Sequence, residues 1–122
     1  MILLIFLNFF FLKGDSSLTN LTKVNSIGDF RNAISVTTDG KENIYVLDAG
    51  TNQIVKFNSQ LEYKKRNGKQ GWGEGQFDYP TYIDGSSGLD IFVADGKNHR
   101  IQRLDLDLNY ISSLITDLPD FN

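Results

Sequence analysis

Two stretches decide the fold: residues 42–57, ENIYVLDAGTNQIVKF, and residues 89–104, LDIFVADGKNHRIQRL. Sliding the chain against itself by 47 positions aligns them without a gap, and the register extends on both sides. Identical residues occupy eight pairs over 36 positions: Gly28/Gly75, Phe30/Phe77, Ile44/Ile91, Val46/Val93, Asp48/Asp95, Ile54/Ile101, Leu61/Leu108 and Tyr63/Tyr110. A period in the forties is typical of arrays in which each unit is one supersecondary module packed on its neighbours.

Each unit is expected to form four short strands and no helix. The predicted strands are 33–37, 43–48, 53–58 and 61–66 in the first unit, and 81–84, 90–94, 100–105 and 109–115 in the second. They are rich in Ile, Val, Tyr and Phe and are separated by turn-forming clusters. No stretch has the periodicity of a long amphipathic helix. Four-stranded antiparallel meanders of this length predict an all-β fold, a partial β-propeller with two blades.

The second unit resembles the NHL repeat, a family named for its Asn-His-Leu type triplet. The resemblance is carried by Gly73-Glu74-Gly75-Gln76-Phe77-Asp78-Tyr79-Pro80, then Ile91-Phe92-Val93-Ala94-Asp95, then Asn98-His99-Arg100-Ile101-Gln102. The first unit departs from the pattern, because Ala33 stands where the family prefers proline and the histidine is lacking. The resemblance implies a six-bladed propeller in most members, which serves as a binding platform or, less often, as an enzyme with its site on the central channel.

The repeat divides the chain into five segments. We predict a signal peptide or short membrane anchor at 1–14, a leading strand or connector at 15–25, repeat 1 at 26–72, repeat 2 at 73–116, and the start of a truncated third repeat at 117–122. As a helix, the apolar run 2–12 would span ~16 Å, half of a hydrocarbon core of ~30 Å, which suits a signal-peptide core. We therefore expect export to the periplasm, the cell exterior or an anchored position; a buried strand or core helix is the alternative.

Composition excludes several functions. Among 122 residues there are 12 basic and 15 acidic side chains, one histidine and no cysteine. Disulfides, thiolate metal sites and cysteine nucleophiles are therefore ruled out. The acidic balance disfavours nucleic acid, and one histidine is too few for a zinc site with three or four ligands. We expect no metal and no cofactor, no nucleic-acid partner, and membrane contact only through the N-terminal segment.

The repeated polar residues are predicted to be structural. Asp48 and Asp95 each end an apolar strand before a tight turn, where a carboxylate can accept backbone N–H bonds; catalysis is the alternative. The remaining structural repeat positions are Phe30, Ile54, Phe77, Pro80, Asn98 and Ile101. No catalytic residue is assigned.

Trp72, His99 and Arg100 are the candidate ligand-binding residues. The glycine-rich stretch 68–75 is interpreted as an inter-blade connection in which Trp72 covers a blade interface; alternatively, Trp72 is exposed at a ligand mouth. His99 is interpreted as a turn residue, with a zinc ligand as the alternative. Basic residues gather locally and are interpreted as solvated faces: Lys64, Lys65, Arg66, Lys69, Lys97, Arg100 and Arg103.

The function favoured by the sequence is a non-enzymatic, extracytoplasmic NHL-repeat module that binds a protein, peptide or glycan. The alternative is a fragment of a propeller enzyme, a lactonase-like hydrolase or lyase, whose site lies mostly on blades beyond this chain. RNA binding is a third hypothesis, opposed by the acidic balance and the leader. Because two blades leave apolar faces uncovered, we also expect either a longer parent chain or self-association, for example three copies in one ring.

Overall fold

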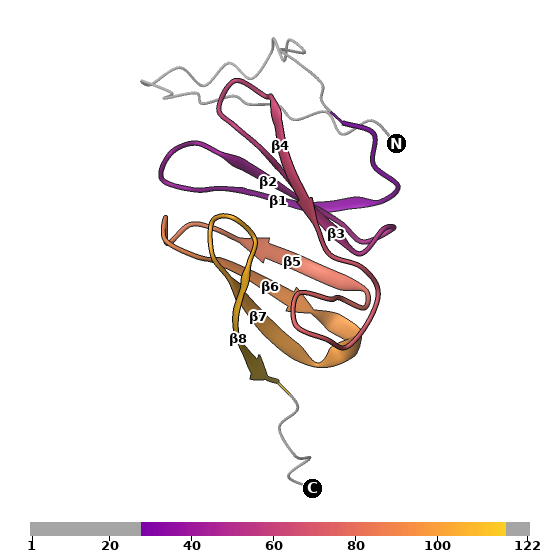
Figure 1. Cartoon of the computed structure of the whole chain (residues 1–122). Helices are drawn as coiled ribbons and strands as arrows, with labels where there is room; N and C mark the ends of the chain where they lie inside the picture. Colours follow the sequence, from indigo (N-terminus) through magenta and orange to yellow (C-terminus); the bar gives the residue numbers. More distant parts are fainter. Residues whose placement is uncertain (1–27, 117–122) are drawn as a thin grey trace, which may run out of the picture.

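The computed structural model describes residues 28–116, and its strands form two four-stranded antiparallel sheets (Figure 1). Blade 1 contains β1 (Ala33–Thr38), β2 (Ile44–Asp48), β3 (Gln53–Phe57) and β4 (Tyr63–Asn67). Blade 2 contains β5 (Pro80–Asp84), β6 (Ile91–Asp95), β7 (Arg100–Leu104) and β8 (Tyr110–Ile115). In both blades the spatial order follows the chain. Within the described part, helical structure is limited to the 3-10 turn η1 (Gly96–Asn98).

The all-β prediction with two four-stranded blades is confirmed, and every predicted strand boundary lies within two residues of the observed one. This agreement arises because the strands are short, β-branched and bounded by turn residues. The expected signal or anchor at 1–14, the leading strand or connector at 15–25 and the third repeat at 117–122 lie outside the described residues.

Backbone irregularities repeat with the same period as the sequence. A register shift between Ala33 and Ser35 recurs between Pro80 and Tyr82, and one between Lys56 and Phe57 recurs between Arg103 and Leu104. Left-handed backbone also recurs, in the pair Asn52 (φ 54°) and His99 (φ 49°) and in the pair Leu61 (φ 66°) and Leu108 (φ 64°). A bulge bends a strand at a defined position. Because the irregularities recur at an offset of 47, the backbone geometry repeats together with the sequence.

Blade 2 packs on one face of blade 1, with an apolar core between them (Figure 1). This inter-blade cluster contains Tyr45, Leu47, Ile54, Phe77, Ile83, Ile91, Val93, Leu104 and Leu108. A second cluster lies on the opposite face of blade 1 and contains Phe30, Ile44, Val46, Val55 and Phe57. Since side chains alternate between the faces of a strand, β2 is buried along its whole length by the two clusters.

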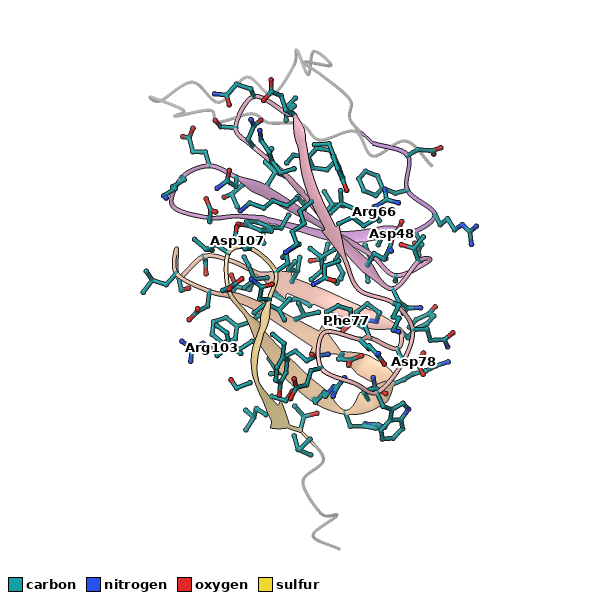
Figure 2. The ribbon with its side chains drawn as sticks, in the orientation of Figure 1. Asp48, Arg66, Phe77, Asp78, Arg103 and Asp107 are labelled. Atoms are coloured by element: carbon teal, nitrogen blue, oxygen red, sulfur yellow. The ribbon has the colours of Figure 1, made fainter. Side chains whose placement is uncertain are left out.

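Polar contacts fix how the blades lie on each other. The N–H groups of Ile83 and Gly85 on blade 2 donate to the hydroxyls of Ser35 (3.1 Å) and Thr37 (2.9 Å) on β1. The turn between β7 and β8, which carries Asp107, lies against blade 1 (Figure 2). Its carbonyls accept hydrogen bonds from four side chains of blade 1: Lys56 (2.6 Å) and Tyr45 (3.0 Å) to Leu106, Lys65 to Asp107 (2.6 Å) and Asn67 to Leu108 (2.7 Å).

Candidate functional site

Asp95 is the centre of a buried polar cluster at the end of β6. Its side chain is fully buried, and its Oδ1 accepts the N–H of Asp78 at 2.7 Å. Its Oδ2 accepts from Asn98 Nδ2 (2.9 Å), Arg100 Nε (2.9 Å) and Gln102 Nε2 (3.1 Å). A buried charge needs such partners, because desolvation otherwise outweighs its attraction to a counter-ion. We call Asp95, Asn98, Arg100 and Gln102 the Asp95 cluster.

The Asp95 cluster fixes the backbone of the connection between β4 and β5. Arg100 donates to the carbonyls of Trp72 (2.9 Å), Gly73 (2.9 Å) and Gln76 (3.0 Å). Asn98 Nδ2 donates to the Gly71 carbonyl at 2.8 Å. Gln102 closes the set, since Nε2 donates to the Gln76 carbonyl (2.6 Å) and Oε1 accepts from the Gly75 N–H (3.0 Å). Six hydrogen bonds therefore hold residues 71–76.

Trp72 projects from this fixed loop and its side chain is 76% exposed. The interpretation that it covers a blade interface is therefore wrong. Phe77 is buried in the inter-blade cluster and belongs to that interface instead. The part of the alternative interpretation in which Trp72 is exposed agrees with the structure.

Tyr79 is a second exposed aromatic residue on the same connection. Its backbone is left-handed (φ 53°), its N–H donates to Asn52 Oδ1 at 3.0 Å, and Lys97 Nζ lies 5.3 Å from the ring centroid. A lysine over a tyrosine face restrains the ring through a cation–π contact. Trp72 and Tyr79 thus present aromatic surface from an ordered backbone.

His99 follows η1 as a turn residue, as predicted. Its N–H donates to the Gly96 carbonyl (3.2 Å) and its carbonyl accepts the Thr116 N–H (2.8 Å), so it joins the turn to the end of β8. Within residues 28–116 no three His, Cys, Asp or Glu side chains are grouped closely enough to hold a metal ion.

The interpretation of Arg100 as part of a solvated face is wrong. Its side chain is only 12% exposed, and Nε, Nη1 and Nη2 all donate inward. Arg100 therefore positions Trp72 through the loop backbone, and its fork of planar donors suits that role better than a lysine would. Lys65 also departs from the solvated interpretation, because it binds the Asp107 carbonyl of the neighbouring blade.

The predicted structural positions are brought into the core or its edge. Phe30, Ile54, Phe77, Pro80 and Asn98 are buried, and Ile101 is half-buried. The Oδ1 atom of Asn98 is buried without a hydrogen-bond partner among the described residues.

Asp48 binds backbone donors, as expected. It accepts from the N–H groups of Arg31 (3.0 Å), Asn32 (2.8 Å) and Gly50 (3.0 Å). Burial alone would raise the pKa of Asp48, but these bonds favour the carboxylate and hold the pKa below its ordinary value.

Sequence reasoning missed Asp39, which organises the turn before β2. Its carboxylate accepts from Lys41 N (2.8 Å), Asn43 N (3.1 Å) and Tyr45 Oη (2.8 Å). Burial opposes these bonds, yet the pKa of Asp39 is lowered; for Tyr45, burial and the bond to Asp39 together raise the pKa. The only signal was the Asp39-Gly40 dipeptide, which predicts a turn but not the buried tyrosine that binds it.

No protein-family model matches the chain, and a search of curated proteins finds no match either. No helix in the 28–116 region has the length and apolar character needed to cross a membrane.

Proposed function

We propose that this chain is a non-enzymatic, extracytoplasmic module of NHL-like propeller blades, which binds a protein, peptide or glycan through Trp72. The observation that carries this proposal is an indole, 76% exposed, on a loop whose backbone is fixed by six hydrogen bonds. Aromatic side chains bury a large area on binding. A loop that is already ordered loses little conformational entropy when a ligand binds, so the contact retains more of its free energy.

The polar groups nearby support binding rather than bond chemistry. The carboxylate of Asp95 has four hydrogen-bond donors around it, and Arg100 donates through all three of its nitrogens. Groups engaged in this way orient a loop and do not act as a general base or a nucleophile, which need access to the reacting atom. Membership of the NHL family and export rest on the resemblance of the repeats and on the apolar run 2–12.

Intrinsic fluorescence provides a direct test, because Trp72 is the single tryptophan of the chain. The probes are short neutral and acidic oligosaccharides and a display library of short peptides. We expect the free protein to show the emission spectrum of a solvent-exposed indole. Addition of the probe class that binds should shift this emission to the blue or quench it. By calorimetry, Trp72→Ala should weaken binding by at least about tenfold, as for a central aromatic contact.

Leu89→Ala is the matched control, since Leu89 is also 76% exposed but lies in the turn before β6. It should bind as the wild type does. Failure of both probe classes to bind the wild-type protein, or equal binding by Trp72→Ala, would overturn the proposal.

A further inference from the structure

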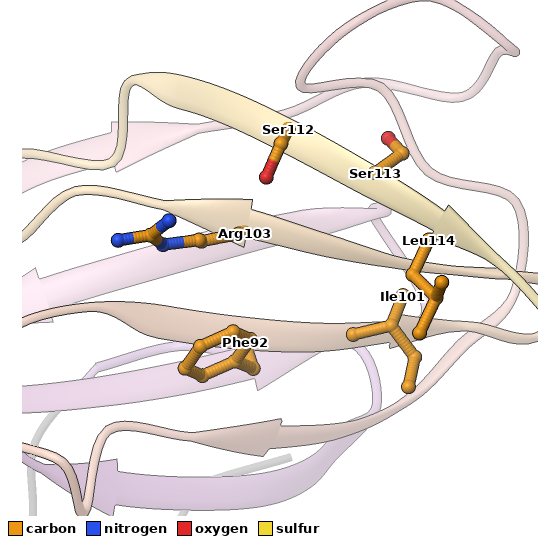
Figure 3. A pocket seen from close by; sticks show the side chains of 6 residues that line it. All are labelled: Phe92, Ile101, Arg103, Ser112, Ser113 and Leu114. Carbon is orange, nitrogen blue, oxygen red and sulfur yellow. The ribbon is translucent and has the colours of Figure 1, made fainter.

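Among residues 28–116, no strand covers the face of blade 2 that points away from blade 1. Phe92, Ile101, Arg103, Ser112, Ser113 and Leu114 line a hollow of about 310 Å³ on it (Figure 3). Phe92 is 37% and Leu114 is 66% exposed. In blade 1 the strand β2 is buried on both faces, whereas in its counterpart β6 burial alternates with exposure. We call this surface of blade 2 the open face.

The open face is the repeat equivalent of a face that is already covered. A shift of 47 positions takes Phe92 to Tyr45, Ile101 to Ile54, Arg103 to Lys56, Ser112 to Lys65 and Leu114 to Asn67. All five of these blade 1 residues lie against blade 2: Tyr45 and Ile54 are in the inter-blade cluster, and the other three donate to the β7–β8 turn. The open face therefore has the position of a receiving surface for a blade.

The chemistry is retained at the central positions. Phe92 is aromatic, as Tyr45 is, and Ile101 is identical to Ile54. Arg103 is a cation, as Lys56 is. Arg103 holds Asp90 through Nε (2.9 Å) and Nη2 (2.7 Å). A guanidinium has five N–H donors, so this ion pair leaves donors for the carbonyl groups of a neighbouring turn, which is the contact that Lys56 makes.

The chain also carries a second copy of the surface that covers a blade. Blade 2 covers blade 1 with Phe77, Ile91, Val93, Leu104 and Leu108. The equivalent residues of blade 1 are Phe30, Ile44, Val46, Phe57 and Leu61, and four of the five are identical. They lie on the side of blade 1 opposite to blade 2. The open face and this second covering surface thus lie on opposite sides of the pair of blades, so they do not meet each other within residues 28–116.

We propose that a second copy of this chain docks its blade 1 on the open face of blade 2, in the same geometry by which blade 2 covers blade 1. Such a contact is heterologous, and repetition of it closes a ring or extends a filament. In the single chain Phe30, Ile44, Val46 and Phe57 are buried and Leu61 is half-buried. Docking requires that they become exposed first, so we expect association to be slower than typical protein encounters.

Cysteine cross-linking tests this geometry, because the chain contains no cysteine of its own. Within the chain, Lys65 contacts the Asp107 carbonyl; the equivalent residues across the proposed contact are Ser112 and Gln60, which are both exposed. A mixture of full-length Ser112→Cys and Gln60→Cys chains, treated with a short bismaleimide, should give a cross-linked heterodimer. The control mixture pairs Gln60→Cys with Leu89→Cys and should give at least about tenfold less product, in keeping with loss of a specific contact.

Adding Phe92→Asp to the Ser112→Cys chain should abolish the product while circular dichroism remains that of the wild type. Leu114→Asp serves as the second variant if Phe92→Asp unfolds. Light scattering of the wild-type chain should show a mass that rises above the monomer with concentration. A monomer at every concentration, or equal cross-linking in the control mixture, would overturn the proposal.

Discussion

Asp48 in blade 1 and Asp95 in blade 2 occupy the same place in the repeat, yet their carboxylates bind different groups. Both accept an N–H from the segment 17 residues before, Arg31 in one case and Asp78 in the other. Asp48 otherwise binds backbone donors, whereas Asp95 binds three side chains. The cause lies in the aligned positions, because Asn98, Arg100 and Gln102 stand where blade 1 has Thr51, Gln53 and Val55.

The comparison separates two functions of one repeat position. In both blades the carboxylate at the end of the second strand (β2 or β6) binds backbone N–H groups just before the first strand (β1 or β5). This attachment needs only the carboxylate. In blade 2, the three side chains that bind Asp95 also hold the loop 71–76, which carries the exposed Trp72. One repeat position can thus take on an additional structural role in one blade through substitutions in the turn and strand that follow it.

Asp95→Ala should have the largest effect. It leaves the Arg100 guanidinium, which is 12% exposed, without its counter-ion and deprives two buried amides of an acceptor. We expect a loss of about 3–5 kcal/mol in the free energy of unfolding, measured with urea. Asp90→Ala is the control, because it breaks the more exposed ion pair with Arg103 and should cost about 0–1 kcal/mol. Similar losses in the two variants would contradict the assignment of Asp95 as the buried counter-ion on which Arg100 depends.

Asp48→Ala should cost less, about 1–3 kcal/mol at neutral pH, because it removes an acceptor from backbone N–H groups and leaves no buried charge unpaired. Since the pKa of Asp48 is lowered in the folded protein, its stabilising effect is present above the unfolded pKa of about 3.9 and is lost as the pH falls through the folded value. Urea unfolding at decreasing pH should therefore show the gap between wild type and variant narrowing below about pH 4. A constant gap at all pH values would contradict the ionic role of Asp48.

Asn52→Ala should have the smallest effect of the three, about 1–1.5 kcal/mol. The substitution removes the acceptor for Tyr79 N–H, a bond of 3.0 Å between the blades, and places alanine at φ 54°. Thr51→Ala is the neighbouring control, since the hydrogen bond from its hydroxyl to the Asp48 carbonyl is long, at 3.5 Å, and it should lie within about 0.5 kcal/mol of the wild type. Equal stability of both variants would show that Asn52 does not link the blades.

The strands and their pairing were predictable from the sequence because they depend on local patterns and on a gapless offset. The Asp95 cluster was not predictable in detail, since Arg100 binds carbonyls of residues 24 to 28 positions earlier, and no local rule specifies such contacts. One signal was present: Gln102 is polar where the aligned Val55 is apolar, and a polar residue at a core position needs a partner. The position of Trp72 was misjudged because its exposure depends on that same cluster.

The left-handed leucines of the β3–β4 and β7–β8 turns show how a connecting loop becomes restricted. Glycine would suit φ values of 66° and 64° better, and a leucine there carries strain of about 1–2 kcal/mol. Leu108 is nevertheless fully buried between the blades, and its carbonyl accepts a hydrogen bond from Asn67. Relief of the strain by glycine would empty a space of leucine size at the interface, so both residue choices carry a penalty. A hairpin tip, usually the segment most tolerant of sequence drift, is here a wedge whose identity is constrained as tightly as the strands it joins.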